Sequence, residues 1–455
     1  MSKLSDISAQ AAAKAQQTVG KYLERGSAEL HYARKMFSAG ALKLEPPQDI
    51  AAFVADIRRW GEFGMIPALN ARRTPNAAAV IDDFGEMTFK ELDDAANAVA
   101  NGLLAKGIKG GDGVAILARN HRWFLVSVYG AAKTGARIIL LNSEFSGPQI
   151  KEVSEREGGK LIIYDDEYTK AVQAAEPELG KLRALGINPD KPDEPSGTDE
   201  TLEDLIARTG SAPPPKASKH SSIIILTSGT TGTPKGANRS APPSLAPIGG
   251  VLSAVPFKAN EVTSLPAPMF HALGFLHATI AMMLGSTLVL RRRFKPATVL
   301  ADIEKHRATA IVVVPVMLSR MLDELDKTSP KPDLSSLRKG YYGAAIMPVE
   351  VLGELGRRLP NVRFWNLYGQ TEIAPLATVL LSADYQMTID DGRAVIRGEV
   401  EIELLQEGLQ QIPLQFAGVA LLSATLDDQP AALGRAAGQQ VQLFVEGVGK
   451  HRLKL

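Results

Sequence analysis

The sequence is defined first by what it lacks. It has no cysteine among 455 residues, which excludes disulfide bonds and thiolate metal sites. It also has almost no net charge, with 51 basic and 50 acidic residues, so it offers no field that would hold a nucleic-acid backbone. We therefore expect no nucleic-acid partner. A chain of this length that needs no disulfides suits a reducing compartment, and we expect a cytoplasmic protein of two or three domains.

Signals for secretion or membrane insertion are also missing. Residues 1–10 lack the basic start and apolar core of a secretory signal, and Asp6 argues against a transit peptide. No charged residue lies between Glu261 and Arg291, but prolines and glycines interrupt this stretch. It predicts strand, turn and helix in a protein core, not a membrane span. Residues 1–45 predict a helical extension whose mixed charges favour a solvated or docking helix, with peripheral membrane contact left open.

Residues 46–380 show the pattern of an α/β enzyme. Short apolar runs alternate with amphipathic helical segments, which predicts crossover units and parallel sheets buried on both faces. A proline-rich linker at about 188–220 divides this body into two α/β subdomains. The expected strands are 79–82, 87–89, 114–118, 138–141, 161–164, 223–226, 287–290, 310–314 and 362–366.

Beyond residue 380 the composition changes. Residues 382–455 contain nine glutamines against seven in the preceding 381, and apolar and acidic residues alternate over 399–404. This alternation is typical of half-exposed antiparallel strands. Because the sequence stops within an expected strand, we interpret 381–455 as a short, incomplete β-rich tail.

The most informative segment directly follows the strand at 223–226. Small residues let a loop curl so that several amide hydrogens converge, hydroxyls add donors, and one lysine adds a compact positive charge, which together predict a polyphosphate cradle. It is not a Walker A loop, because Pro234 and Gly236 flank the lysine. The alternative is a flexible Gly/Thr-rich surface loop. The candidate phosphate-binding residues are Thr227, Ser228, Gly229, Thr230, Thr231, Gly232 and Lys235.

This loop resembles the phosphate-binding signature of adenylate-forming enzymes, the group of acyl-CoA synthetases, luciferases and peptide-synthetase adenylation domains. A second family signature, Tyr368–Glu372, follows the strand at 362–366. The segment Trp60–Asn70 more narrowly resembles actinobacterial long-chain fatty-acid CoA ligases. The resemblance covers about residues 20–380 and implies the layered parallel sheets of the family's N-terminal domain.

The second signature supplies residues suited to ATP chemistry. Glu372 is a hard oxygen ligand for Mg²⁺, Thr371 can donate to the α-phosphate, and the Tyr368 ring offers a face for adenine. The resemblance implies these roles, and implies that Lys235 neutralises charge at the phosphates. The alternatives are a core tyrosine at 368 and a surface carboxylate at 372.

Two further segments resemble family features. Gly343, Ala344 and Ala345 resemble a small-residue loop that lines the adenine and acyl pockets, although they could form a simple tight turn. The segment Phe270–Gly274 resembles the segment whose histidine, here His271, borders the acyl and thiol channel; a satisfied core histidine is the alternative. We assign His277 to the core.

Other family features have no counterpart. We find neither the Thr-Gly-Asp motif, whose aspartate holds ribose, nor the mobile C-terminal domain with its adenylating lysine. Gly449–Arg452 echoes the family's terminal Gly-Lys-x-x-Arg, but the spacing is one residue short, so we treat it as coincidence. The tail therefore replaces the family's C-terminal region, and we expect impaired turnover.

The resulting hypothesis is a long-chain fatty-acid CoA ligase. A fatty acid and ATP would give acyl-AMP and pyrophosphate, with Mg²⁺ as cofactor, and CoA would then displace AMP. Two alternatives stay open. One is a nucleotide- and acyl-binding pseudoenzyme, and the other is an interaction protein that acts through the β-rich tail.

Overall fold

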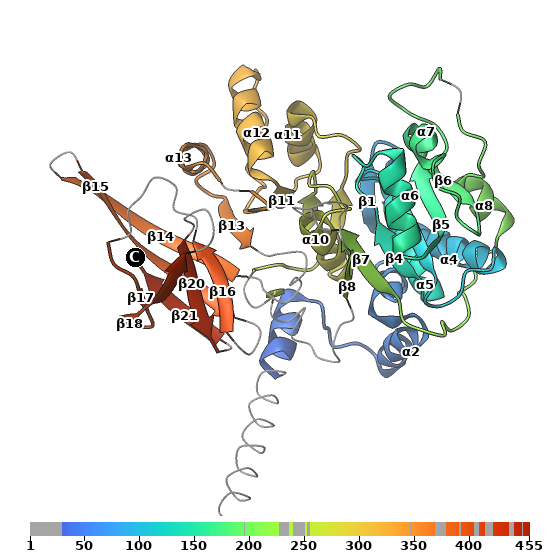
Figure 1. The fold of residues 1–455 in the computed structure, drawn as a ribbon, viewed down its shortest axis with the longest axis horizontal. Coiled ribbons are helices and arrows are strands. Elements are labelled where there is room, and N and C mark those ends of the chain that lie inside the picture. Colours follow the sequence, from blue (N-terminus) through green and yellow to red (C-terminus); the bar gives the residue numbers. More distant parts are fainter. Residues whose placement is uncertain are drawn as a thin grey trace, which may run out of the picture.

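The computed structural model describes residues 30–455 except 195, 227–235, 240–250, 253–254, 346, 369–378, 391–392, 405–408, 415–421, 436–440 and 448. Three sheets organise these residues. Figure 1 shows the six-stranded sheet at one end of the molecule and the C-terminal strands at the other, with parallel strands of a second sheet between them.

The six-stranded sheet forms from strands between residues 113 and 239. Its strands, in spatial order, are β6 (Lys181–Leu185), β5 (Gly159–Asp165), β3 (Gly113–Leu117), β4 (Arg137–Leu140), β7 (Ser222–Leu226) and β8 (Gly236–Arg239). All neighbours pair in parallel except β7 and β8. The central strands are apolar on both faces because helices cover both, as expected for parallel strands.

The larger sheet has twelve strands. In spatial order they are β18 (Gln429–Pro430), β17 (Thr425–Leu426), β21 (Gly449–Lys454), β15 (Arg393–Leu404), β14 (Val379–Asp390), β13 (Arg363–Tyr368), β12 (Lys339–Gly343), β11 (Ala310–Val313), β9 (Val262–Ser264), β10 (Thr287–Val289), β1 (Ala78–Asp82) and β2 (Gly85–Thr88). The strands from β13 to β1 are parallel. The strands at both ends are antiparallel.

The helices form layers against these sheets. Their bounds are α2 (Pro47–Gly64), α3 (Ile66–Arg73), α4 (Phe89–Ala105), α5 (Arg122–Thr134), α6 (Gly147–Arg156), α7 (Thr169–Val172), α8 (Leu202–Arg208), α10 (Ala272–Met283), α11 (Pro296–Lys305), α12 (Pro315–Lys327) and α13 (Val349–Arg358). A further helix spans 30–39. Local sequence sets several helix ends: Thr88 and Glu91 make a reciprocal capping box at the start of α4, and Gly135 ends α5 in a left-handed conformation.

One large apolar core joins the two parallel sheets. It contains alternate residues of β3 and β11, such as Val114 and Val312, together with side chains of α3, α4, α5 and α10. The opposite face of β11 and β12 packs on α11, α12 and α13 in a second core. The opposite face of β3 packs on α6 in a third core. The predicted α/β class with layered parallel sheets is therefore confirmed.

The C-terminal strands extend the larger sheet and add a small one. The β14 strand pairs with β13, where Asn366 lies opposite Leu381. A three-stranded antiparallel sheet of β16 (Leu409–Leu414), β20 (Val441–Glu446) and β19 (Ala432–Arg435) shares a small core with β15 and β21, which includes Ile402 and Leu443. The expected β-rich character is confirmed, whereas the proposed domain limits stay predictions.

The uncharged stretch before Arg291 forms β9, α10 and β10, as the sequence predicted. In the part of the chain that the structure describes, no helix is long and apolar enough to cross a bilayer.

Candidate active site

All of the predicted phosphate-binding residues lie outside the described residues. These are Thr227, Ser228, Gly229, Thr230, Thr231, Gly232, Lys235, Thr371 and Glu372. The side chain of Tyr368 also lies outside, although its backbone ends β13. The described residues place His271 and Gly343–Ala345, and they place the strands from which the two signature loops emerge.

Both ends of the phosphate loop are held by neighbouring strands. Leu226 at the end of β7 pairs with Gly236 at the start of β8, in an antiparallel register. The loop thus starts and finishes at one point on the sheet edge. Since β7 runs parallel to β4 and β3, this is the carboxyl edge, where α/β sheets usually bind ligands.

The other predicted segments gather at the carboxyl edge of the larger sheet. Gly343, at the end of β12, lies opposite Leu367 of β13, so Gly343–Ala345 and Tyr368 follow adjacent parallel strands. The segment carrying His271 follows β9, and Ala267 donates its backbone N–H to Val312 of β11 at 3.2 Å. Three signatures that are far apart in sequence therefore share one sheet edge.

The small residues after β12 leave the backbone accessible. Ala344 and Ala345 are both exposed, and Ala344 has a φ of 67°. A non-glycine residue in this left-handed region is uncommon and typically costs about 1 kcal/mol or more. The backbone therefore turns sharply where the resemblance implies a pocket wall, which is compatible with a bound nucleotide or acyl group.

His271 marks the start of α10. It is the N-cap residue, its ring lies 4.3 Å from that of Phe270, and it is exposed. Desolvation by the surrounding protein nevertheless lowers the pKa of His271 below its usual value. A neutral imidazole at pH 7 can accept or relay a proton but supplies no positive charge.

A close backbone approach explains the glycine of this segment. A Cβ at Gly274 would lie 2.2 Å from the carbonyl oxygen of Pro268 and 2.6 Å from its carbonyl carbon. Real side chains do not tolerate such distances. Gly274 thus lets the first turn of α10 press against the segment that precedes His271.

Asn120 holds the same segment from the other sheet, and the sequence analysis missed it. Its side-chain NH₂ donates to the carbonyl oxygens of Leu265 and Ala267 at 3.1 and 2.9 Å, and its Oδ1 accepts from Met269 N–H at 2.8 Å. Its burial makes this amide a strong positional constraint, because each group would be costly to leave unpaired. The only signal for Asn120 in the sequence was that Arg-Asn-His follows the end of a buried strand.

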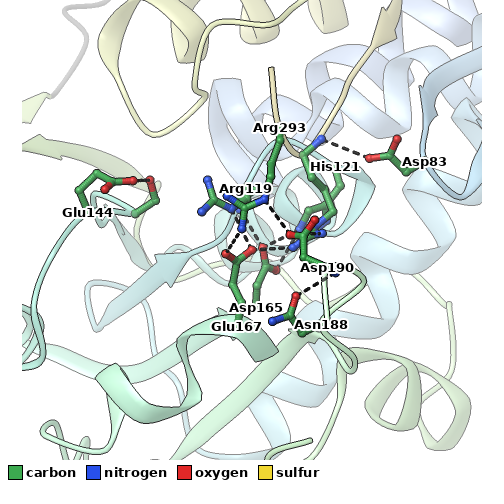
Figure 2. Close-up of polar contacts among 11 residues, drawn as sticks. Asp83, Arg119, His121, Glu144, Asp165, Glu167, Asn188, Asp190 and Arg293 are labelled. Atoms are coloured by element: carbon green, nitrogen blue, oxygen red, sulfur yellow. Dashed lines mark hydrogen bonds and ion pairs between the residues drawn. The ribbon is translucent and has the colours of Figure 1, made fainter. Parts of the chain in front are cut away.

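A charged network joins the same two sheets (Figure 2). Glu167, after β5, accepts from Arg119 at 2.8 Å, from Arg292 at 2.5 Å and from Arg293 at 3.1 Å. Nearby, Nε2 of His121 lies 2.9 and 3.0 Å from the two oxygens of the buried Asp165. These contacts lie at the carboxyl ends of β3, β5 and β10 and connect the two sheets.

Comparison with known proteins identifies the family of this chain. The profile of a family described as AMP-binding enzyme matches residues 68–418. The chain belongs to the AMP-binding enzyme family. The AMP-binding match continues past residue 380 into the β-rich region.

Curated relatives are similar along the same part of the chain. A feruloyl-CoA synthase from an Amycolatopsis species is 29% identical over 325 residues, which is 70% of this chain and 61% of that protein. A medium-chain fatty-acid CoA ligase of Escherichia coli is 28% identical over 365 residues, 78% of this chain and 63% of that protein. This AMP-binding chain therefore spans less than two thirds of the length of these two relatives.

Solved structures confirm the fold. The N-terminal domain of FACL13 from Mycobacterium tuberculosis superposes with a TM-score of 0.58 and 23% identity, covering 75% of this chain and 89% of that domain.

Among the described residues no group of three or more histidine or carboxylate side chains could hold a metal ion, so the Mg²⁺ prediction depends on Glu372.

Proposed function

We propose that this chain activates a carboxylic acid with ATP and transfers the acyl group to CoA. A carboxylate oxygen of the acid attacks the α-phosphorus of ATP, and the bond to the bridging oxygen breaks, releasing pyrophosphate. The CoA sulfur, as it loses its proton, then attacks the acyl carbon, and AMP leaves. One observation carries the proposal: within an AMP-binding family chain, the segments of His271, Gly343–Ala345 and Tyr368 share one sheet edge.

The described residues support binding and orientation. Asn120 and Gly274 hold the segment of His271 against β11, so that its neutral ring borders the proposed acyl and thiol channel. Small side chains at Ala344 and Ala345 leave room beside the proposed adenine position. Mg²⁺ would neutralise phosphate charge when bound, with Glu372 as its proposed ligand and Lys235 beside it.

The acid is proposed to be a fatty acid, from the resemblance of Trp60–Asn70 to long-chain fatty-acid ligases. The names of relatives cover feruloyl, medium-chain and long-chain acids, so acid choice needs a direct assay. We further propose slow turnover by these 455 residues alone. The adenylating lysine of the family has no counterpart here, and removal of one preorganised donor typically costs about 10²- to 10³-fold in rate.

The test is pyrophosphate release with ATP, Mg²⁺ and a panel of acids, followed by thioester detection with CoA. Asn120→Leu should reduce release by displacing the His271 segment, while Asn101→Leu serves as the control, since that half-buried amide donates to the carbonyl oxygens of Gly210 and Ala212 instead. Nucleotide binding without any release from the native chain would favour the pseudoenzyme alternative. Absence of nucleotide binding would favour the interaction protein.

A further inference from the structure

Large apolar side chains gather on the outside of the N-terminal region. Twelve such side chains are exposed among the described residues, and five of them lie within residues 30–54. Single exposed apolar residues are ordinary, whereas a group of them marks an interaction site. The region precedes the AMP-binding match, which begins at residue 68. The five side chains are those of Leu30, Phe37, Leu44, Ile50 and Val54.

The helix at 30–39 is apolar on two opposite faces. Met36 and Ala39 are buried in the large core, and Ala259 donates its backbone N–H to the Ala39 carbonyl oxygen at 2.7 Å, which fixes the helix on the body. Leu30 and Phe37 are seven residues apart, so they share a face, and about half of each side chain is exposed. A helix that only covered a core would carry polar side chains on that outer face.

The connection that follows and α2 repeat this arrangement. Leu44 is 93% exposed and lies in the connection, shortly before two prolines. In α2, Trp60 is buried, whereas Ile50 and Val54, one turn apart, are exposed. Figure 1 shows the helix at 30–39 and α2 at the same side of the molecule, along the lower edge of the view. The exposed apolar side chains thus belong to consecutive elements on one side.

Exposed basic side chains accompany the apolar ones on each of these elements. They are Arg34 on the outer face of the helix at 30–39, Lys43 next to Leu44, and Arg58 one turn after Val54. We call these three residues and the five apolar residues the N-terminal surface. Long basic side chains can lie along apolar surface while they keep their charge in water.

The acidic residues of the same region do not neutralise this surface. Residues 30–59 contain five basic and three acidic residues. Glu45 and Asp56 are bound to Arg73 and Arg72 of α3, which leaves Asp49 as the third acidic residue. The N-terminal surface is therefore both apolar and positively charged.

We propose that the N-terminal surface docks this chain on an anionic lipid bilayer. The apolar side chains enter the boundary between head groups and acyl chains, and the basic side chains stay at the level of the lipid phosphates. Leu44 contributes most per residue, because almost none of its side chain contacts the protein. The inference goes beyond the proposed function and does not depend on it.

Charge favours a bilayer over a second copy of this chain. In a two-fold dimer the same surface meets itself, so basic side chains would face basic side chains. An anionic bilayer supplies an apolar phase and the opposite charge together. Long-chain fatty acids also collect in bilayers, because their hydrocarbon chains leave water, so docking there agrees with the proposed acid.

The experiment measures binding of the full chain to vesicles by sedimentation, without ATP or acid. Vesicles of phosphatidylcholine alone are compared with vesicles in which about one third of the lipid is phosphatidylglycerol. The native chain should bind the anionic vesicles about 10-fold or more tightly than the neutral ones, because each basic residue near the surface adds attraction. Added salt should weaken the binding to anionic vesicles, because it screens this attraction.

Matched variants locate the surface. Leu44→Gln should weaken binding to anionic vesicles about 10-fold, since transfer of one leucine side chain out of water is lost. Lys43→Gln should weaken it about 5-fold and leave binding to neutral vesicles unchanged. The control is Leu422→Gln, because Leu422 is also highly exposed, at 83%, but precedes β17 in the C-terminal region. It should bind both vesicles as the native chain does.

Several results would overturn the inference. These are no vesicle binding by the native chain, equal binding to neutral and anionic vesicles, native binding by Leu44→Gln, or an equal loss in Leu422→Gln. A dimer that Leu44→Gln dissociates, in a chain that binds no vesicles, would assign the surface to a second copy. Pyrophosphate release with a water-soluble acid tests the proposed function separately, and Leu44→Gln should release it at the native rate.

Discussion

The two parallel sheets differ in the polar side chains near their carboxyl edges, although each edge also holds buried polar atoms without a described partner, such as Nδ1 of His121. At the edge of the six-stranded sheet, charges are paired: Glu167 binds three arginines, and Asp165 binds His121 and the Arg119 backbone (Figure 2). At the edge of the larger sheet, His271 and His277 have pKa values lowered by desolvation, and the Tyr341 hydroxyl lacks a described partner.

This contrast separates polar groups that stabilise the folded chain from polar groups that are suited to bind a ligand. A buried charge with several partners holds a subdomain junction, because loss of one member leaves the others uncompensated. A buried neutral group without a partner weakens the empty protein and gains most when a ligand supplies the missing bond. We therefore expect substitutions at the two edges to change stability with different signs and pH dependence.

Among the predicted substitutions, Glu167→Gln should lower the free energy of unfolding most. The change leaves three arginines short of their shared carboxylate, and breaking such a buried group typically costs about 3 to 5 kcal/mol. Unfolding in guanidinium chloride, followed by fluorescence, measures the loss. In the control, Glu354→Gln removes a carboxylate that binds Arg357 and Arg358 at the surface of α13, where solvent screening makes the expected loss much smaller. Equal losses in the two variants would show that the Glu167 network does not stabilise the junction.

The second-largest expected effect is a dependence of the free energy of unfolding on pH, caused by His277. Its pKa is about 4 in the folded chain and ~6.5 when unfolded, so the unfolded chain binds a proton first as pH falls. This difference contributes about 3 kcal/mol of destabilisation between pH 6.5 and 4. Denaturant midpoints at pH 7.5 and 4.5 should therefore converge in His277→Phe relative to the native chain. Parallel shifts in both proteins would contradict the assignment.

A smaller effect is expected at Gly274. An alanine there meets the Pro268 carbonyl, and the backbone must move, at a cost of about 1 to 3 kcal/mol. Gly353→Ala in α13 has open space around the new methyl group and should stabilise the chain by about 0.5 kcal/mol. Melting temperatures of the two variants should move in opposite directions, and a shift of both in the same direction would contradict the close approach.

The smallest predicted effect compares two buried tyrosines, one at each edge. Tyr341→Phe removes an unpartnered hydroxyl and should raise the free energy of unfolding by about 1 kcal/mol without ligand. Tyr164→Phe in β5 removes a hydroxyl that donates to Asp199 at 2.7 Å, and should lower it by about 1 kcal/mol. A destabilised Tyr341→Phe would mean that its hydroxyl is already satisfied.

Sequence reasoning located most strands because the parallel strands are buried on both faces and read as short apolar runs. The strands β1 and β2 and the alternating strand β15 lie where the sequence predicted. The family resemblance also pointed to the segments of His271, Gly343 and Tyr368, whose roles stay predictions. Sequence reasoning missed β6, which is too polar to stand out.

The sequence by itself determined the local elements, the signature segments and the family that they resemble. Only the tertiary structure decided which polar groups meet. Asn120 lies 145 residues from Leu265, and Glu167 lies 125 residues from Arg292, so no local pattern could pair them. The same applies to His277 and Tyr341, whose chemistry comes from desolvation by the layers packed around them. Local propensity selects helices and strands, but hydrogen-bond satisfaction and pKa depend on neighbours that only folding brings together.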